Sequence, residues 1–237
     1  MKILIFIPAR GGSKGIPGKN MVILNGKPLI HYTLMTAKEL MQNKSFLWLP
    51  FVSTDDHKTA TYCKKQGFHM DYMRPKNLAE DKSLMIDGIL DALIWLKQNK
   101  GIIPDAILLL QPTTPLRKTA NIINAIKEVD RENLFSLVSI TRMREHPYEC
   151  VKMNKQGWSY LSKPIGRPAG RQQYNDNYFF IDGSFYFASL KFIKKYLTFL
   201  IENKTKFFLL DHLWPIDIDE KDDLLIADVL LKKYGKN

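Results

Sequence analysis

The chain opens with the stretch Met1-Lys-Ile-Leu-Ile-Phe-Ile7, which runs directly into Pro8-Ala-Arg-Gly-Gly-Ser-Lys-Gly-Ile-Pro-Gly-Lys-Asn20. The apolar run predicts a buried strand. The loop after it holds four glycines, two prolines, three cationic side chains and one serine in thirteen positions. Glycines let the backbone approach a ligand closely, so that successive N–H groups can point into one concavity. Because Arg10, Lys14 and Lys19 add positive charge around it, the loop predicts a polyphosphate ligand.

Two common phosphate-binding motifs do not match this loop. The Walker A pattern G-x-x-x-x-G-K-[ST] fails because Gly18-Lys19 is followed by Asn20, and Ser13 occupies the upstream glycine position. The dinucleotide pattern G-x-G-x-x-G also fails, because the glycines are spaced as Gly12-x-x-Gly15-x-x-Gly18. A flexible surface loop is the alternative, but turns rarely need so many cations.

Apolar strand-like runs alternate with helical patterns along the chain, which predicts an α/β fold with an open, mostly parallel, Rossmann-like sheet. Pro50, inside the second strand, predicts an edge or irregular position there. The predicted strands are 2–7, 47–53, 107–110, 134–140 and 215–218, and the predicted helices are about 29–42, 57–66, 84–97, 119–131 and 220–233. Ligands bind outside the carboxyl ends of such strands. The opening loop, 54–55, 111–117 and 217–219 should therefore surround one crevice.

The segment from about 142 to 208 interrupts this alternation. It is rich in aromatic residues and has hairpin-like runs at 158–161 and 179–187. We interpret it as an inserted subdomain within a single domain of residues 1–237, after which the chain returns to the sheet at Pro215.

Composition limits the functional classes. No apolar run approaches the ~18 residues needed to span a membrane, and the short N-terminal run does not resemble a signal peptide. Cys63 and Cys150, the only cysteines, show neither metal-binding nor disulfide spacing, so a reducing, cytoplasmic location is expected. The net charge of +11 is spread along the chain without stacking-aromatic motifs. It fits anionic substrates as well as nucleic acid, and we expect neither a nucleic-acid nor a membrane partner.

The second informative stretch is Ile216-Asp217-Ile218-Asp219. In a strand, alternate residues share a face, so both isoleucines could enter the core while both carboxylates face the crevice. Adjacent carboxylates together with phosphate oxygens suit Mg²⁺, or Mn²⁺ in its place. The alternative is that Asp219 caps the next helix, with Asp222 at its third position. Capping does not explain Asp217, and the two roles are compatible.

Two further loops follow predicted strands. In Leu110-Gln-Pro-Thr-Thr-Pro-Leu-Arg117 the prolines fix the backbone, and rigid presentation of Gln111, Thr113, Thr114 and Arg117 suits recognition of a sugar or nucleotide. Simple entry into the helix near residue 119 explains this stretch about as well. Val52-Ser-Thr-Asp55 is interpreted mainly as a helix cap.

The combination of Pro8–Asn20, Gln111–Arg117 and Ile216–Asp219 resembles the acylneuraminate cytidylyltransferases, which make CMP-activated nine-carbon sugar acids. Weaker matches are Arg74-Pro-Lys-Asn-Leu-Ala-Glu-Asp81, Arg171-Gln172 and Asp182-Gly-Ser-Phe-Tyr186. The resemblance spans nearly the whole chain. It implies a fold of the nucleotide-diphospho-sugar transferase type, a homodimer formed with the inserted subdomain, and CTP and a nonulosonic acid as substrates.

The resemblance also implies residue roles. The implied catalytic residues are Arg10, Lys19, Arg171, Asp217 and Asp219, and the last two would bind the metal. The implied nucleotide-binding residues are Ala9, Arg10, Gly11, Ser13, Lys14, Lys19, Asn20, Arg74 and Ser83. The implied sugar-binding residues are Gln111, Thr113, Thr114, Arg171, Gln172, Tyr186, Phe207 and Phe208. Arg171-Gln172 read alone is an ordinary polar turn, and Phe207-Phe208 fits a packed short strand equally well.

Departures from the family pattern bear on the sugar. Lys82-Ser-Leu-Met85 replaces a run of small hydroxyl residues, Glu149 stands where some sialate enzymes have lysine, and Phe179-Phe180 where some have arginine. Fewer cations near the sugar favour a related substrate such as legionaminic acid. CMP-Kdo and CMP-pseudaminate synthetases are the alternatives within the superfamily, although Kdo enzymes usually lack the Gly11–Gly15 run. A non-catalytic nucleic-acid-binding protein is the alternative from another class.

Overall fold

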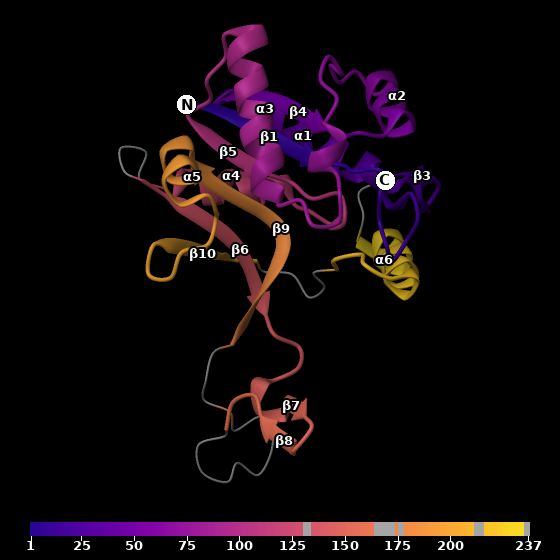
Figure 1. Cartoon of the computed structure of the whole chain (residues 1–237), viewed down its shortest axis with the longest axis vertical. Helices are drawn as coiled ribbons and strands as arrows, with labels where there is room; N and C mark the ends of the chain where they lie inside the picture. Colours follow the sequence, from indigo (N-terminus) through magenta and orange to yellow (C-terminus); the bar gives the residue numbers. More distant parts are fainter. Residues whose placement is uncertain (130–133, 164–173, 175–177, 211–215, 235–237) are drawn as a thin grey trace.

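A computed structural model of the chain describes residues 1–129, 134–163, 174, 178–210 and 216–234. Figure 1 shows a main body and an arm that projects from it. The strands are β1 (Lys2–Pro8), β2 (Ile23–Leu24), β3 (Lys27–Pro28), β4 (Leu47–Ser53), β5 (Ala106–Leu109), β6 (Ser136–Arg142), β7 (Val151–Asn154), β8 (Gly157–Tyr160), β9 (Phe179–Ser189) and β10 (Thr205–Leu209). The helices are α1 (Leu29–Gln42), α2 (His57–Lys65), α3 (Met85–Lys100), α4 (Thr119–Lys127), α5 (Leu190–Tyr196) and α6 (Lys221–Tyr234), with short 3-10 turns η1 (Lys19–Met21), η2 (Lys76–Leu78) and η3 (Pro147–Glu149).

The central sheet has six strands in the order β10-β6-β9-β5-β1-β4. β1 runs parallel to β4 and β5, and β10 runs parallel to β6, whereas β9 is antiparallel to both its neighbours. The prediction of an open, mostly parallel sheet is confirmed. Pro50 lies in the edge strand β4, as its missing N–H donor requires.

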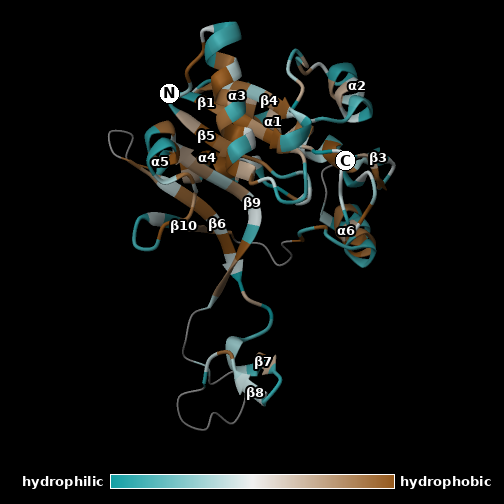
Figure 2. Ribbon diagram, viewed as in Figure 1, coloured by the Kyte–Doolittle hydropathy of each residue, from teal (hydrophilic) through white to brown (hydrophobic). Residues whose placement is uncertain are grey.

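The sheet is buried on both faces. Ile3, Ile5 and Ile7 of β1 belong to a core cluster with α1 and α4, while Leu4 and Phe6 belong to a second cluster with α3 and α5. Two-sided burial explains why the strand is apolar at consecutive positions instead of alternating. Figure 2 shows a long hydrophobic stretch along β6 in the main sheet.

A third, smaller core joins the two informative stretches of sequence. Ile16 of the opening loop packs with Ile216, Ile218 and the inner face of α6. This packing corrects the strand predicted at 215–218: residues 216–219 are in no strand, and Pro215 lies outside the described residues. The predicted alternation is nevertheless present, with Ile216 and Ile218 buried and both aspartates exposed. Ile216 and Ile218 are buried because they pack against the opening loop and α6. They do not extend the sheet, whose edge strands are β10 and β4.

The arm consists of the β7–β8 hairpin, which confirms the strand predicted near 158–161. Two other strands from the 142–208 range, β9 and β10, pair within the main sheet. The chain therefore returns to the sheet earlier than Pro215, and the part outside it lies between β6 and β9. The five helices predicted from sequence are all present within a few residues, and α5 was not predicted. Within the described part of the chain, no helix is both long and apolar enough to cross a bilayer.

Candidate active site

The opening loop and the 216–219 segment meet directly. Lys19 donates from Nζ to the Ile218 carbonyl at 2.7 Å and to Asp219 Oδ1 at 2.8 Å. At Gly15 the two backbones are so close that a Cβ would lie 2.3 Å from the Asp219 carbonyl oxygen. A glycine is therefore required there by proximity to another segment, not by a positive φ. The structure thus joins the predicted phosphate loop to the predicted carboxylate pair.

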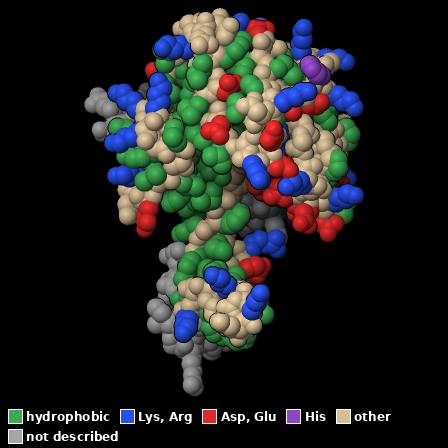
Figure 3. Space-filling model, in the orientation of Figure 1, with side chains coloured by type: hydrophobic (Ala, Val, Ile, Leu, Met, Phe, Trp, Pro, Cys, Tyr) green, Lys and Arg blue, Asp and Glu red, His purple; other side chains and the backbone are tan. Residues whose placement is uncertain are grey.

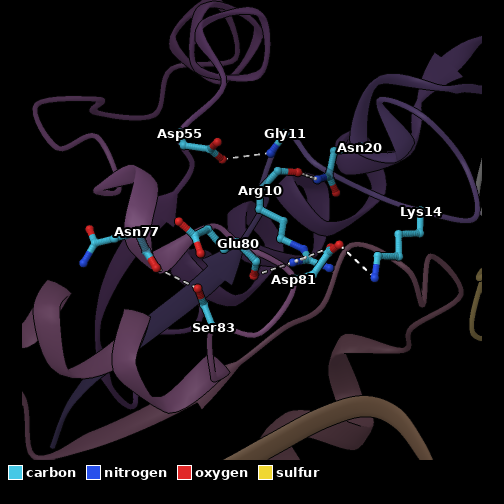
Figure 4. A network of polar contacts seen from close by, with 9 residues as sticks. All are labelled: Arg10, Gly11, Lys14, Asn20, Asp55, Asn77, Glu80, Asp81 and Ser83. Carbon is cyan, nitrogen blue, oxygen red and sulfur yellow. Dashed lines mark hydrogen bonds and ion pairs between the residues drawn. The ribbon is translucent and has the colours of Figure 1, made fainter.

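The other two loop cations are held by an acidic residue from the turn after η2. Asp81 lies 3.4 Å from Arg10 Nη1 and 3.0 Å from Lys14 Nζ, and Arg10 also donates to the Glu80 carbonyl at 2.8 Å (Figure 4). These side chains are well exposed, so each ion pair contributes little stability. Both cations can exchange Asp81 for a stronger anionic ligand at small cost. Sequence reasoning did not assign this role to Asp81, although the residue closes the Arg74–Asp81 motif.

The loop backbone is fixed from both sides. The Gly11 amide donates to Asp55 Oδ1 at 2.8 Å, and Asn20 Nδ2 donates to the Arg10 carbonyl at 2.8 Å (Figure 4). The sequence predicts that Asp55 caps α2, but it does not. Asp56 is the cap and accepts from Thr59 N at 2.8 Å. Asp55 instead holds the Gly11 amide of the loop, so the turn after β4 serves the site as well as the helix.

Other nucleotide-binding residues predicted from the resemblance differ in accessibility. Ala9 is buried, and its N–H continues the sheet by donating to the Ser53 carbonyl at 2.9 Å. Arg74 is also buried, donating through Nε to Ser53 Oγ at 2.9 Å, and burial lowers the pKa of its guanidinium. Ser83 donates to the Asn77 carbonyl at 2.8 Å, and Ser13 is half-buried in the loop.

Gln111, Thr114 and Asp217 converge on Gly183 of β9. A Cβ at Gly183 would lie 3.1 Å from Gln111 Oε1, 3.4 Å from Thr114 Cγ2 and 3.5 Å from Asp217 Oδ2. Gly183 also has a φ of +71°, so both its conformation and its surroundings require glycine. The Ile218 amide donates to the Thr113 carbonyl at 2.8 Å, and this bond holds the backbone next to Asp217 against the 111–117 loop.

Arg117 points into the protein and holds the 111–117 loop through hydrogen bonds. Its guanidinium donates to the Ser184 carbonyl at 2.5 Å, and also to the Gln111 carbonyl and the Thr114 hydroxyl. Burial lowers the pKa of Arg117, while the charges of Asp182 and Asp217 act in the opposite direction. The expectation that Arg117 presents itself to a ligand is wrong. Thr114 is likewise buried, with its hydroxyl bonded inside the protein.

Asp182, immediately before Gly183, was not singled out as a site residue. Its side chain is 1% exposed, and Oδ1 accepts from Ser139 Oγ at 2.6 Å and from Ser184 N at 2.9 Å. Its other oxygen has no hydrogen-bond partner among the described residues. The positive charge of Arg117 compensates this carboxylate. An Asp-Gly pair inside a strand-like run signals an irregular backbone, and a register shift does occur opposite it, between Val138 and Ile140.

The surroundings of Asp217, one of the two predicted metal ligands, perturb its pKa. Surrounding protein atoms remove part of its hydration and raise its pKa, and the charge of Asp219 adds to the increase. A hydrogen bond with Thr113 and the charges of Lys19 and Arg117 act against it. A cation placed between the two carboxylates would relieve both effects.

The donor set fits Mg²⁺ bound partly by substrate. The described residues hold no group of three or more His, Cys, Asp or Glu side chains arranged for a metal. Two carboxylates from Asp217 and Asp219 are what Mg²⁺ uses when phosphates and water supply its remaining ligands. Asp219 does not cap α6: Asp223 accepts from Asp219 N at 2.9 Å and from Glu220 N at 2.8 Å. The Asp219 carboxylate, engaged only by Lys19 in the described bonds, faces outward.

The remaining sugar-binding predictions fall at three places. Tyr186 of β9 has its pKa raised by burial and, in addition, by the charges of Asp217 and Asp182. Phe208 is partly buried against Phe185, with ring centroids 6.1 Å apart, whereas Phe207 is 50% exposed on the edge strand β10. Arg171 and Gln172 lie outside the described residues.

Comparisons with known proteins identify relatives of this chain. The chain is 34% identical to CMP-N,N'-diacetyllegionaminic acid synthase of Legionella pneumophila over 98% of this chain and 97% of that protein. It is 29% identical to pseudaminic acid cytidylyltransferase of Campylobacter jejuni over 98% and 97% of the two chains. It is also 29% identical to N-acylneuraminate cytidylyltransferase of Streptococcus agalactiae, over 95% of this chain but 52% of that protein.

A solved structure of CMP:2-keto-3-deoxy-manno-octonic acid synthetase, complexed with CTP, superposes with a TM-score of 0.70. It covers 98% of this chain and 99% of that one at 17% identity, which shows that the two chains share their fold. The family model described as "Cytidylyltransferase" matches residues 4–157. That match contains the opening loop, the Arg74–Asp81 segment and the 111–117 loop. The chain therefore belongs to the cytidylyltransferase family and is an enzyme of nucleotidyl transfer.

Proposed function

We propose that the protein couples CTP to a nonulosonic acid, giving the CMP-sugar and pyrophosphate. The observation that carries this proposal is the junction of the opening loop with Asp219, through Lys19 and the close approach at Gly15. A glycine-rich cationic loop beside a carboxylate pair is what a metal-bound triphosphate requires. The relatives named for CMP-legionaminate, sialate and pseudaminate synthesis support the substrate class.

In the proposed reaction the anomeric hydroxyl oxygen attacks the α-phosphorus of CTP in line. A new P–O bond forms, the bond to the β-phosphate oxygen breaks, and the hydroxyl proton is lost to solvent or base. Catalysis of this kind rests on positioning and electrostatics. Arg10 and Lys14 would leave Asp81 for the triphosphate, and Lys19, fixed by Ile218 and Asp219, would offset charge on the departing pyrophosphate.

Asp217 and Asp219 would hold Mg²⁺, or Mn²⁺ in its place. When bound, the metal polarises the phosphoryl oxygen and neutralises developing charge. Lys19 now occupies one oxygen of Asp219. The lysine and the metal would share this carboxylate, and Lys19 would then stay beside the phosphates.

The sugar would lie over Gly183, between Gln111 and Tyr186. Gln111 and Thr113 would donate to or accept from its hydroxyls, with Thr114 fixing the loop beneath them. We assign Arg171 to the sugar carboxylate and Gln172 to its neighbourhood from the family resemblance. The exposed Phe180, with Glu149 in place of a cation, favours N,N'-diacetyllegionaminate over N-acetylneuraminate, in line with the 34% identical relative.

We infer a homodimer located in the cytoplasm. The β7–β8 arm is exposed on both strands, and Met153 and Trp158 are 70% and 58% exposed. Phe207 adds a large apolar side chain on the edge strand β10. Isolated hairpins of this kind are marginal alone, and pairing with a second subunit would bury them. Light scattering that gives a monomer at all concentrations would refute this part.

Pyrophosphate release over four nucleoside triphosphates and a panel of legionaminic, neuraminic, pseudaminic and Kdo substrates tests the proposal. We expect release with CTP and a nonulosonate only, fastest with diacetyllegionaminate. Faster turnover of N-acetylneuraminate would overturn the sugar assignment. Tight, steeply salt-dependent binding of oligonucleotides without pyrophosphate release would favour the nucleic-acid alternative.

A further inference from the structure

A shallow groove lies beside α2, on the side of the helix that faces η1 and α1. It is lined by Met21, His57, Lys58, Thr61, Tyr62 and Lys65 and has a volume of about 390 Å³. Lys58, Tyr62 and Lys65 follow one another at helical spacing and so form a single stripe. We call this hollow the α2 groove. Its volume lies in the range of about 300–1,000 Å³ typical of small-molecule sites.

The ionised side chains that line the groove are cationic. The lining includes two lysines and a histidine but no acidic residue. Among the described residues, no ion pair involves Lys58 or Lys65. The nearest acid along the chain, Asp56, accepts from the backbone N–H groups of Lys58 and Thr59 at the start of α2, and its carboxylate also interacts electrostatically with the Lys58 charge. Figure 3 shows Lys and Arg side chains gathered around a histidine over α2.

The inner wall of the groove is polar and fixed. The Tyr62 hydroxyl lies 3.0 Å from His31 Nδ1, and their rings meet edge to face. Burial lowers the pKa of His31, and the charges of Lys27 and Lys38 lower it further. Both effects disfavour a charged imidazole at this wall of the groove.

We propose that the α2 groove is an accessory binding site for a small phosphorylated anion of the pyrophosphate or nucleotide type. Lys58 and Lys65 would meet its charge from either end of the stripe, and the hydroxyls of Thr61 and Tyr62 would bond its oxygens. Met21 links the groove to the candidate active site, because it ends η1, the turn that begins with Lys19. An anion held here can therefore act on the placement of Lys19.

Inorganic pyrophosphate, titrated into the full-length protein by calorimetry without added metal, tests the site. We expect two binding events per chain in the wild type and one in the double variant K58E/K65E. K64E is the matched control, because Lys64 is an exposed lysine of the same helix that does not line the groove. In K64E the affinity of the second binding event should stay within about threefold of wild type. In K58E/K65E the affinity of that event should fall at least tenfold.

A single event in the wild type, or equal loss in K64E and K58E/K65E, would overturn the proposal. Binding of a 20-mer oligonucleotide at the groove in place of pyrophosphate would overturn it as well. A second readout, which rests on the proposed function, is product inhibition. Pyrophosphate should inhibit the wild type in a mixed pattern and the double variant only competitively with CTP, while kcat without pyrophosphate stays unchanged. Because the calorimetry needs no turnover, failure of the proposed function would leave the binding test intact.

Discussion

Replacing Gly15 by alanine tests the junction on which the proposed site depends. The added Cβ would lie 2.3 Å from the Asp219 carbonyl oxygen, a backbone atom that no side-chain rotation can remove. Reaching an ordinary carbon–oxygen contact of about 3.4 Å requires the loop and the 216–219 segment to separate by about 1 Å. A misplacement of that size costs about 100-fold in rate, which equals about 2.7 kcal/mol of transition-state stabilisation.

The same separation loosens the third core, where Ile16 packs on Ile216 and Ile218. Overpacking of this kind costs about 1–3 kcal/mol of folding free energy, or a fall in Tm of about 2–4 °C for each kcal/mol in a chain of this size. The assays are pyrophosphate release under kcat/KM conditions and thermal unfolding of the same preparations. We expect G15A to remain folded at 25 °C while kcat/KM for CTP falls about 100-fold.

Gly12→Ala is the matched control. Gly12 lies in the same loop, and a Cβ built there meets nothing within 4 Å. Neither glycine has a positive φ, so the two substitutions change backbone freedom alike and differ only in the clash. If G15A and G12A show the same kcat/KM and the same Tm, the close approach to Asp219 has no functional role and the reasoning fails.

Three other changes give distinct outcomes. Asp217→Asn should lower kcat by about 100-fold or more while KM for CTP changes little; unchanged turnover at saturating Mg²⁺ would remove Asp217 from the catalytic set. Arg117→Met should cost about 3–5 kcal/mol in urea unfolding, because buried Asp182 loses its compensating charge; a loss below about 1 kcal/mol would contradict this. Asp56→Ala should cost about 1 kcal/mol at neutral pH. Desolvation acts to raise the pKa of Asp56, but hydrogen bonds from Thr59 outweigh it and the net pKa is lowered. The cap's contribution is therefore present above the ordinary value of 3.8 and lost as pH falls through the lower folded value; a difference independent of pH would refute it.

Local patterns predicted most elements because they report burial directly. β1 is apolar at every position from Ile3 to Pro8, since both faces of the sheet are covered, and α1 begins and ends at Leu29 and Gln42 as its periodicity predicts. The same logic fails where burial does not come from the sheet. Ile216 and Ile218 alternate with Asp217 and Asp219 as in a strand, yet they pack against α6 and the opening loop without strand pairing.

The sequence by itself determined the class of this protein: a buried first strand, a cationic glycine loop, a paired carboxylate and a mostly parallel sheet. Tertiary structure alone decided which side chains face the site. In the folded chain Arg117 points inward, Asp56 caps α2, and Asp55 accepts from the Gly11 amide of the opening loop. Lys19 bonds to Asp219, which is 200 positions away in the sequence. The physical reason is that periodicity and spacing encode which residues are buried. The partner that a charged side chain finds depends on contacts between segments distant in sequence.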